Sequence, residues 1–510
     1  MTFPEIETVA IVGAGPGGLA SLYEFLHLNK DGSSTVGSAP SADPKFAVTV
    51  FEQKSSAGGI WAPSEEADLP VPPQHLLDTD RYNEPDVIHP KVPIPEEVRA
   101  DGSAATYNSP YVTQSKQLDR ELEWKRSGVY PDLFTNIPSR FIRFSYQDNE
   151  PEYNDKKRAI YPFLTQKELA SRFTNFIAKE QLSKHIRYNT RVEEVTKDQA
   201  RGKWIITVRE TNEKAGTESW YKQEFDAVVV ANGHYTVPNF PRLKGLAEFN
   251  RKNPGVLIHA KSYRDSNIFR GKRVLVVGGG ISAANLVQYI FPLASETVIT
   301  RRGPHLVFPW IDSGLESPGI VTKPPIQEFQ DDGSVVFTDG SVADKFDVVL
   351  LTTGYHYHYP FLDNYLKVVD PSNLSRVAGL YQQTFSIDDP TLAIAGVAVS
   401  AINFHTIEAS AAAIAGVWSG AKQLPPREEQ QKWETDRVAA LGDNLFFHYY
   451  PYATVEADYI AQLHAYAAHG RPSPFVEDGK YVADVGVGLD YLEQLFYKLK
   501  EGKLTIEETK

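Results

Sequence analysis

Two glycine-rich segments of this sequence have the spacing that receives the pyrophosphate of a dinucleotide. In the first, Gly13, Gly15 and Gly18 form a GxGxxG pattern between the apolar run VAIV and the helical stretch LASLYEFL. Glycine is needed because the backbone must turn tightly and approach a phosphate without a Cβ in the way. The start of the following helix offers unpaired N–H groups and the positive end of its dipole. This segment therefore predicts a bound adenine dinucleotide.

An acidic residue at the end of the next predicted strand, AVTVFE, indicates which dinucleotide binds there. The Glu52 carboxylate suits the hydroxyls of a ribose, which favours FAD or NAD over NADP. Glu52 lies further from Gly18 than the roughly 20 residues usual for this pattern. The stretch 31–45, rich in Gly, Ser, Ala and Pro, accounts for the excess as a surface loop.

The second glycine-rich segment, VLVVGGGISAANL, follows the GxGxxA variant of the same pattern. The strand predicted after it, TVIT, ends in two arginines at the place where an acid would contact a ribose hydroxyl. A guanidinium matches a 2′-phosphate in shape and charge, so this segment predicts NADPH, with Arg301 as the principal phosphate ligand. That both arginines merely face solvent stays open as the alternative. The residues expected at this second site are Gly278, Gly280, Ser282, Ala283, Thr300, Arg301 and Arg302.

The elements that must position these residues are short β-branched runs, each followed by a turn and often by a helical pattern. They have no polar interruption, which suits strands covered on both faces, as in a parallel sheet. The pattern predicts an α/β, doubly wound fold with two Rossmann-like dinucleotide-binding domains. Eight prolines in residues 62–95 predict a long irregular excursion that wraps the surface or borders the active site.

Composition limits the kinds of partner and of chemistry. The net charge of −13 gives no general attraction to nucleic acid or to anionic membranes, although a local basic pocket stays open. The absence of cysteine excludes a thiolate metal site, a Cys nucleophile and the redox dithiol of a pyridine-nucleotide disulfide reductase. Because the N-terminus lacks a signal-peptide pattern and no apolar run is long enough to span a bilayer, we expect a cytoplasmic protein.

The order of the motifs resembles the flavin-containing monooxygenases, which are FAD- and NADPH-dependent class B flavoprotein monooxygenases. After its ribose acid the family carries a Gly-Gly-x-Trp element, which here contains Gly59 and Trp61. The segment FNRKNPGVLIHAKSYR is similar to the family signature Phe-x-Gly-x3-His-x3-Tyr followed by Lys or Arg, except that five residues separate Phe from Gly. The resemblance implies that Gly59, Trp61, His259 and Tyr263 contact a cofactor.

Two further segments resemble the hinges at which the family enters and leaves its NADPH domain. They are VVVANGHY, with Asn232 in place of the usual Thr, and DVVLLTTGYHYHYPFL, with Thr352 in place of Ala. The resemblance implies an NADPH-binding domain inserted in an FAD-binding domain. The expected boundaries are 1–235 for the first part of the FAD domain, 236–354 for the NADPH domain, and 355–510 for the second part of the FAD domain with the C-terminal helices.

The family likeness also implies the reaction. NADPH would reduce FAD, and a hydroperoxyflavin would then transfer one oxygen atom from O2 to a soft nitrogen or sulfur centre of a small amine or sulfur compound. The segment PDLFTNIPSRFIRF resembles the family's Leu-x-Thr-Asn-x-Pro stretch, which makes Asn136 the expected catalytic residue beside the flavin's reactive edge. That Asn136 only caps a turn is the alternative. Residues 404–410, with Gly396 before them, resemble the flavin-contacting C-terminal segment.

Several readings stay open at this point. One is N-hydroxylation of an amino-acid or polyamine side chain, since Asp347 with LTTGY resembles the signature of that group. Another is Baeyer–Villiger oxygenation of a ketone, although those enzymes end the signature with Trp where this chain has Tyr263. A non-enzymatic flavoprotein is a further alternative function. Assembly as a homodimer also stays open. His356 and His358 lack other ligands nearby, so we expect an aromatic interdomain surface and no metal site.

Overall fold

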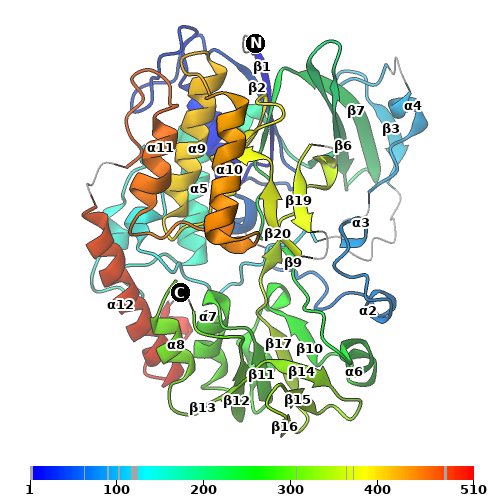
Figure 1. The fold of residues 1–510 in the computed structure, drawn as a ribbon, viewed down its shortest axis with the longest axis vertical. Coiled ribbons are helices and arrows are strands. Elements are labelled where there is room, and N and C mark those ends of the chain that lie inside the picture. The colour runs from blue at the N-terminus through cyan, green and yellow to red at the C-terminus, as the bar shows by residue number, and fades with distance from the viewer. Residues whose placement is uncertain are drawn as a thin grey trace.

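Two parallel β-sheets, stacked one above the other in Figure 1, organise the molecule. The upper unit contains the N-terminus and the lower unit lies around β10 to β17. The computed structural model describes residues 4–62, 64–88, 91–100, 104–115, 124–305, 307–362, 365–370, 373–475 and 479–509.

The first sheet contains strands from both ends of the chain. Its strand order is β21-β22-β23-β8-β1-β2-β4, with parallel pairing from β23 to β4 and antiparallel pairing of β21 to β23. The strands are β1 Thr8–Val12, β2 Ala47–Phe51, β4 Ile186–Arg187, β8 Ala227–Val230, β21 Leu380–Tyr381, β22 Phe385–Ser386 and β23 Leu392–Ile394. Because β8 and β23 are separated in sequence by the whole second sheet, the second unit is inserted in the first.

Alternation of side chains explains why these strands lack polar interruptions. Val9 and Ile11 of β1 belong to the core on one face of the sheet, and Ala10 and Val12 belong to the core on the other. β8 divides in the same way, because successive side chains of a strand point to opposite faces. Each fully buried valine or leucine contributes roughly 1.5–3 kcal/mol.

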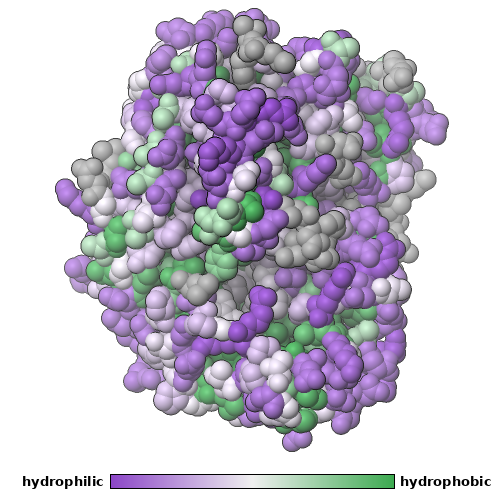
Figure 2. Space-filling model, viewed as in Figure 1, coloured by the Kyte–Doolittle hydropathy of each residue, from purple (hydrophilic) through white to green (hydrophobic). Residues whose placement is uncertain are grey.

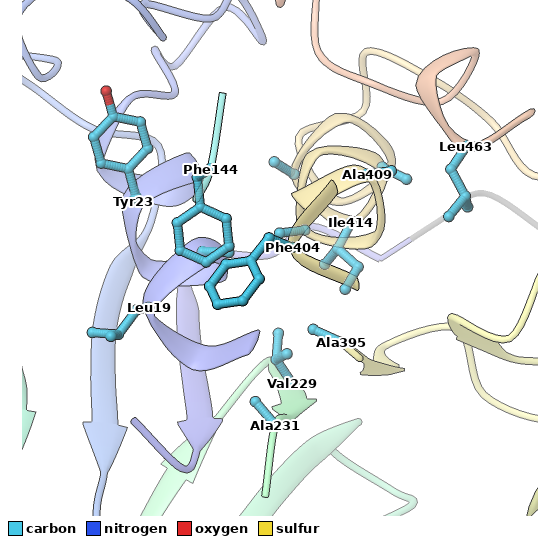
Figure 3. Close-up of a cluster of buried hydrophobic side chains, with 14 of the residues drawn as sticks. Leu19, Tyr23, Phe144, Val229, Ala231, Ala395, Phe404, Ala409, Ile414 and Leu463 are labelled. Atoms are coloured by element: carbon cyan, nitrogen blue, oxygen red, sulfur yellow. The ribbon is translucent and has the colours of Figure 1, made fainter. Parts of the chain in front are cut away.

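Helices cover one face of the first sheet. Figure 3 shows Leu19 of α1 and Ile414 of α9 on either side of Phe404 and Phe144, with Val229 of β8 beneath. The alanine-rich α9 is buried around nearly its whole circumference, as expected of a helix that is apolar on all sides. The helices of this unit are α1 Pro16–Leu26, α5 Gln166–Lys179, α9 Asn403–Trp418, α10 Arg427–Leu441, the π-helical η9 Glu456–Ile460 and α11 Ala461–His464.

The opposite face packs against an antiparallel sheet with strand order β3-β7-β6-β5. Trp204 and Ile206 of β6 enter the same core as Val228 and Val230 of β8. The strands are β3 Tyr111–Gln114, β5 Thr190–Asp198, β6 Lys203–Asn212 and β7 Thr217–Phe225. A two-stranded ribbon, β19 Lys367–Asp370 and β20 Asn373–Ala378, lies further along the chain.

The second sheet is entirely parallel, with strand order β10-β17-β11-β12-β13. Its alternate residues again serve two cores: Val274 and Val276 face one, and Leu275 and Val277 face the other. The strands are β10 Leu257–His259, β11 Arg273–Val277, β12 Glu296–Thr300, β13 Ile320–Lys323 and β17 Val348–Leu351. The paired sheets confirm the predicted α/β fold with two Rossmann-like units, while the boundaries at 235 and 354 stay predictions.

Helices from two distant parts of the chain cover one face of this second sheet. They are α7 Ile281–Ile290, α8 Trp310–Leu315 and α12 Tyr481–Lys500. α12 crosses from the upper unit to lie beside α7 and α8 (Figure 1). The other face is covered by α6 Leu246–Lys252 and a small sheet of β14 Ile326–Phe329, β15 Val335–Phe337 and β16 Val342–Ala343.

Two short strands join the units where the chain passes between them. β9 Val237–Pro238 follows the first hinge and pairs antiparallel with β18 Tyr355–His356 at the second. The segment that follows β2 within the first unit carries three short helices, α2 Gln74–Asp78, α3 Pro85–Ile88 and α4 Glu96–Arg99.

The visible face of the molecule is mostly hydrophilic, with hydrophobic side chains scattered among polar ones (Figure 2). Within the described ranges, no helix combines the length and the apolar character needed to cross a membrane.

Candidate functional site

A cavity opens where the parallel strands of the first sheet end. Its walls include Gly13 after β1, Glu52 after β2, Ala231 after β8 and Gly396 after β23. Ligands of open α/β sheets bind at this edge because the loops there converge and the helices that follow point their N-termini at it. The cavity is therefore positioned by the sheet topology itself.

The first glycine loop accepts no side chain. Gly13 has a φ of +99°, and a Cβ there would lie 2.6 Å from the Ala231 carbonyl oxygen. A Cβ on Gly18 would lie 1.9 Å from the Gly13 carbonyl oxygen. Gly15 is the N-cap of α1, Pro16 is at the first helical position, and no side chain forms a capping hydrogen bond with the helix N-terminus. The loop leaves the N-terminus of α1 open to an anion.

Glu52 ties the glycine loop to the end of β2. Its two carboxylate oxygens accept hydrogen bonds from the backbone N–H groups of Ala14, at 2.8 Å, and Lys54, at 2.9 Å. Burial raises the pKa of Glu52, and these hydrogen bonds act in the opposite direction. The side chain also lines the cavity, as its predicted ribose contact requires.

The Gly-Gly-x-Trp element folds directly onto the glycine loop. The Gly58 N–H donates to the Ala14 carbonyl at 2.8 Å, and a Cβ on Gly59 would lie 3.0 Å from Gly15 Cα. Gly59 and Trp61 form a short 3-10 helix, η1 Gly59–Trp61, and both line the cavity. The structure thus brings together five of the residues predicted for the first cofactor, namely Gly13, Gly15, Glu52, Gly59 and Trp61. Gly18 supports the loop from beneath.

Sequence reasoning missed several parts of the cavity wall. Lys54 donates from Nζ to the Gly59 carbonyl at 3.0 Å, and burial lowers its pKa. Lys125, Arg126 and Arg191 add further cations to the lining. A basic pocket therefore exists in an acidic chain, and its members come from three separate segments, so no local spacing marks them.

The apolar part of the wall comes from the segment that follows β3 in the chain and from α9. Trp124, Phe404 and Ile407 line the cavity together with Trp61. The family resemblance implied that the segment 404–410 contacts the flavin. Two of its residues, Phe404 and Ile407, line the cavity. Among the described residues of the predicted excursion, 62–95, none lines this cavity, and residues 124–127 form part of the lining instead. That the excursion borders the active site stays a prediction.

Three histidines line the cavity near the hinges, with His356 and His358 buried and His234 partly buried. Burial lowers the pKa of His234 and of His356 to about 4, and that of His358 to about 3. They are therefore neutral at pH 7. His356 lies 3.2 Å from the Asn83 side-chain oxygen, and His234 packs against Tyr357. In the described part of the chain no group of three or more His, Asp or Glu side chains is arranged to hold a metal.

The second glycine loop repeats the geometry of the first. Gly278 has a φ of +126°, and a Cβ there would lie 2.5 Å from the Thr352 hydroxyl oxygen. Gly280 is the N-cap of α7 and has open space around it, while Ser282 is exposed and Ala283 is fully buried. The start of α7 is therefore accessible to a phosphate.

Thr300 is hydrogen-bonded to the backbone through both its hydroxyl and its carbonyl. Its hydroxyl donates to the Pro324 carbonyl at 2.6 Å, and its own carbonyl accepts from the Gly278 N–H at 2.9 Å. Both groups are used within the sheet, so Thr300 supports the loop, and its direct contact with a cofactor stays a prediction.

The two arginines that follow Thr300 differ in their surroundings. The Arg301 side chain is 8% exposed and pairs with Asp312 and Glu316. Arg302 is exposed, as the alternative interpretation expected of both. Recognition of a phosphate by either arginine stays a prediction.

His259 and Tyr263 are core residues of the second unit. Each is 1% exposed, and neither lines the cavity. The His259 Nδ1 accepts the Lys261 N–H at 3.1 Å, and Tyr263 stacks on Phe269. Burial lowers the pKa of His259 to about 3. A direct cofactor contact by either side chain stays a prediction. Such a contact would require a conformational change that exposes the side chain.

Asn136 lies in a half-buried loop outside the cavity lining. The neighbouring Thr135 fixes that loop, because its hydroxyl donates to the Ile137 carbonyl at 3.0 Å and accepts the Leu164 N–H at 3.1 Å. Pro138 of the same loop packs against Gly488 of α12. The catalytic role of Asn136 stays a prediction.

Comparison with known proteins agrees with this arrangement. Residues 119–317 and 313–475 match the family model described as flavin-binding monooxygenase-like. A flavin-containing monooxygenase from Arabidopsis thaliana, FMO GS-OX-like 9, is 30% identical over 82% of this chain and 77% of its own length. The trimethylamine monooxygenase of Methylocella silvestris is 28% identical over 86% and 79%. The structure of S-allyl-L-cysteine S-oxygenase from Allium sativum superposes with a TM-score of 0.67 and 23% identity, covering 97% and 98% of the two chains.

Proposed function

The chain belongs to the flavin-binding monooxygenase-like family, and we propose that this FAD- and NADPH-dependent monooxygenase oxygenates a nitrogen or sulfur centre of a small molecule. The observation that carries the proposal is the cavity at the strand ends, where the glycine loop, Glu52 and Trp61 meet. Support for the nitrogen and sulfur classes comes from relatives named as a trimethylamine monooxygenase and as GS-OX-like monooxygenases.

The residues of the cavity fit FAD. Glu52 would hold a ribose, and the glycine loop with the N-terminus of α1 would hold the pyrophosphate. Trp61 and Phe404 offer apolar surface for the ring system. When bound, FAD supplies the electron transfer and the oxygen activation.

The second glycine loop fits NADPH in the same way. The N-terminus of α7 would take the pyrophosphate, and Arg301 with Arg302 would take the 2′-phosphate. The protein's contribution is to orient the two cofactors and to keep water from the reacting centre. The apolar side chains Trp61, Trp124 and Phe404 are placed for the second task.

Product analysis with three probe substrates tests the proposal. Purified FAD-loaded protein is given NADPH and O2 with trimethylamine, methyl phenyl sulfide or cyclohexanone, and each product is identified by mass spectrometry. We expect the N-oxide or the sulfoxide, formed in proportion to the NADPH consumed. A lactone from cyclohexanone alone would favour the Baeyer–Villiger alternative. NADPH consumption that ends entirely in hydrogen peroxide with every probe would contradict the proposal.

A further inference from the structure

Arg301 lies between the second glycine loop and helix α8. Its aliphatic stem packs on the loop, since a Cβ on Gly279 would lie 3.0 Å from Arg301 Cδ. Its two terminal nitrogens are held by carboxylates, Nη1 by Asp312 and Nη2 by Glu316. The predicted ligand of the 2′-phosphate thus already has two anionic partners.

The two carboxylates differ in how firmly they are held. Asp312 lies within α8, whose Ile311 and Leu315 are fully buried, and it also accepts the His305 N–H at 3.0 Å. Its side chain is 25% exposed. Glu316 follows the last residue of α8, and its side chain is 57% exposed. Asp312 is therefore part of a fixed framework, while Glu316 reaches Arg301 from the surface.

The charges at this point set the strength of phosphate binding. Asp312 and Glu316 together offset the charges of Arg301 and the exposed Arg302. A 2′-phosphate that approaches Arg301 would compete with Glu316 for the N–H groups on Nη2, and it would meet the negative charge of that carboxylate. NADH has no 2′-phosphate, so Glu316 does not affect its binding in this way.

We propose that Glu316 is a cofactor-specificity residue, which competes with the 2′-phosphate for Arg301 and so moderates the preference for NADPH over NADH. Asp312 has the opposite effect, because it holds the guanidinium over the glycine loop. This inference rests on the proposed function of Arg301 as the phosphate ligand.

The charge-removing variant Glu316→Gln tests the competition by equilibrium binding of NADP⁺ and NAD⁺ to the FAD-loaded protein. The Kd for NADP⁺ should fall about three- to tenfold, and the effect should shrink at high ionic strength. The Kd for NAD⁺ should not change. Glu248→Gln is the matched control, because Glu248 is also a partly exposed partner of an arginine, Arg251, in the same unit. An unchanged or higher Kd for NADP⁺ in Glu316→Gln would overturn the proposal.

A double-mutant cycle with Arg301→Ala tests separately whether Arg301 binds the 2′-phosphate and whether Glu316 competes with it. If Arg301→Ala leaves NADP⁺ binding unchanged, the assignment of Arg301 fails. If Arg301→Ala weakens NADP⁺ binding but Glu316→Gln has no effect in the wild-type background, only the competition fails. Success requires that the gain from Glu316→Gln disappears when Arg301 is absent. Asp312→Asn should weaken NADP⁺ binding, and tighter binding in that variant would contradict its positioning role.

Discussion

At the scale of single residues, the cavity depends on positions where a side chain has no room. Gly13 is the clearest example, since it combines a left-handed φ of +99° with close contact to the Ala231 carbonyl. A side chain there must both strain the backbone and move the end of β8. The glycine thus couples two neighbouring strands of the sheet at the point where the cofactor would lie.

The Gly13→Ala variant should lose most of its FAD after purification, because the displaced loop no longer fits the pyrophosphate. The ratio of flavin to protein absorbance measures the loss. Gly37→Ala is the control that separates backbone strain from steric overlap of the added Cβ. Gly37 has a φ of +88° but nothing within 4 Å of an added Cβ. That control should retain FAD and lose about 1 kcal/mol of stability. Equal FAD loss in both variants would show that backbone strain alone is responsible.

Residues that follow a strand within a local motif could be predicted from the sequence. Gly13 and Glu52 each stand directly after an apolar run, so the topology of a parallel sheet brings them to one edge. Arg191 reaches the same cavity from a different sheet, and Trp124 reaches it from the segment that follows β3 in the chain. Their placement depends on tertiary packing. The pairing of Arg301 with α8 was missed for the same reason.

At the scale of elements, α9 is held by a buried ion cluster. Glu408 of α9 pairs with Arg471, which also pairs with Glu24 of α1, and all three side chains are at most 2% exposed. Glu408 also accepts the Ser145 N–H at 2.6 Å. Because Phe404 and Ile407 at the start of α9 line the cavity, this ion cluster fixes the position of part of the cavity wall.

Replacing Arg471 by methionine should lower the free energy of unfolding by about 3–5 kcal/mol, since it leaves buried carboxylates unpaired. Burial already raises the pKa of Glu408, and removal of Arg471 raises it further. A carboxyl whose pKa is higher in the folded protein destabilises the fold as pH rises above its unfolded pKa. The loss of unfolding free energy in Arg471→Met relative to the wild-type protein, measured by urea unfolding, should therefore be smaller at pH 5.5 than at pH 8.

The exposed arginine Arg427 provides the matched control for this experiment. It pairs with Asp388, and the two side chains are 56% and 80% exposed. Exposed ion pairs contribute about 0–1 kcal/mol, so Arg427→Met should be nearly neutral at both pH values. A deficit in Arg471→Met that does not depend on pH would mean that lost packing, and not the unpaired carboxylate, is the cause.

At the scale of the whole molecule, α12 connects the loop of Asn136 to the NADPH-binding unit. Its first half meets that loop, where Gly488 packs against Pro138 and Asp484 pairs with Arg140. Its second half enters the core of the second sheet, where Phe496 packs on Trp310. The helix therefore sets the position of this loop relative to the second nucleotide site. Local sequence does not indicate which two regions the helix joins, because that depends on the path of the whole chain.

A methyl group at Gly488 should disturb this connection. A Cβ there would lie 2.4 Å from Pro138 Cγ, so Gly488→Ala must move the loop or the helix. Gly486 is two residues away in the same helix and has nothing within 4 Å of an added Cβ. Gly486→Ala should raise stability by up to about 1 kcal/mol through helix propensity, whereas Gly488→Ala should lower it.

The two variants also test whether the loop of Asn136 serves the reaction. Both should retain FAD, because α12 lines no part of the described cavity. If the loop positions the reacting groups, Gly488→Ala should release more hydrogen peroxide per NADPH consumed than either the wild-type protein or Gly486→Ala. If Gly488→Ala loses stability but this ratio does not change, α12 has only a structural role. That result would count against a catalytic role for Asn136. The comparison works because the same chemical change is made twice on one helix, once facing the loop and once facing open space.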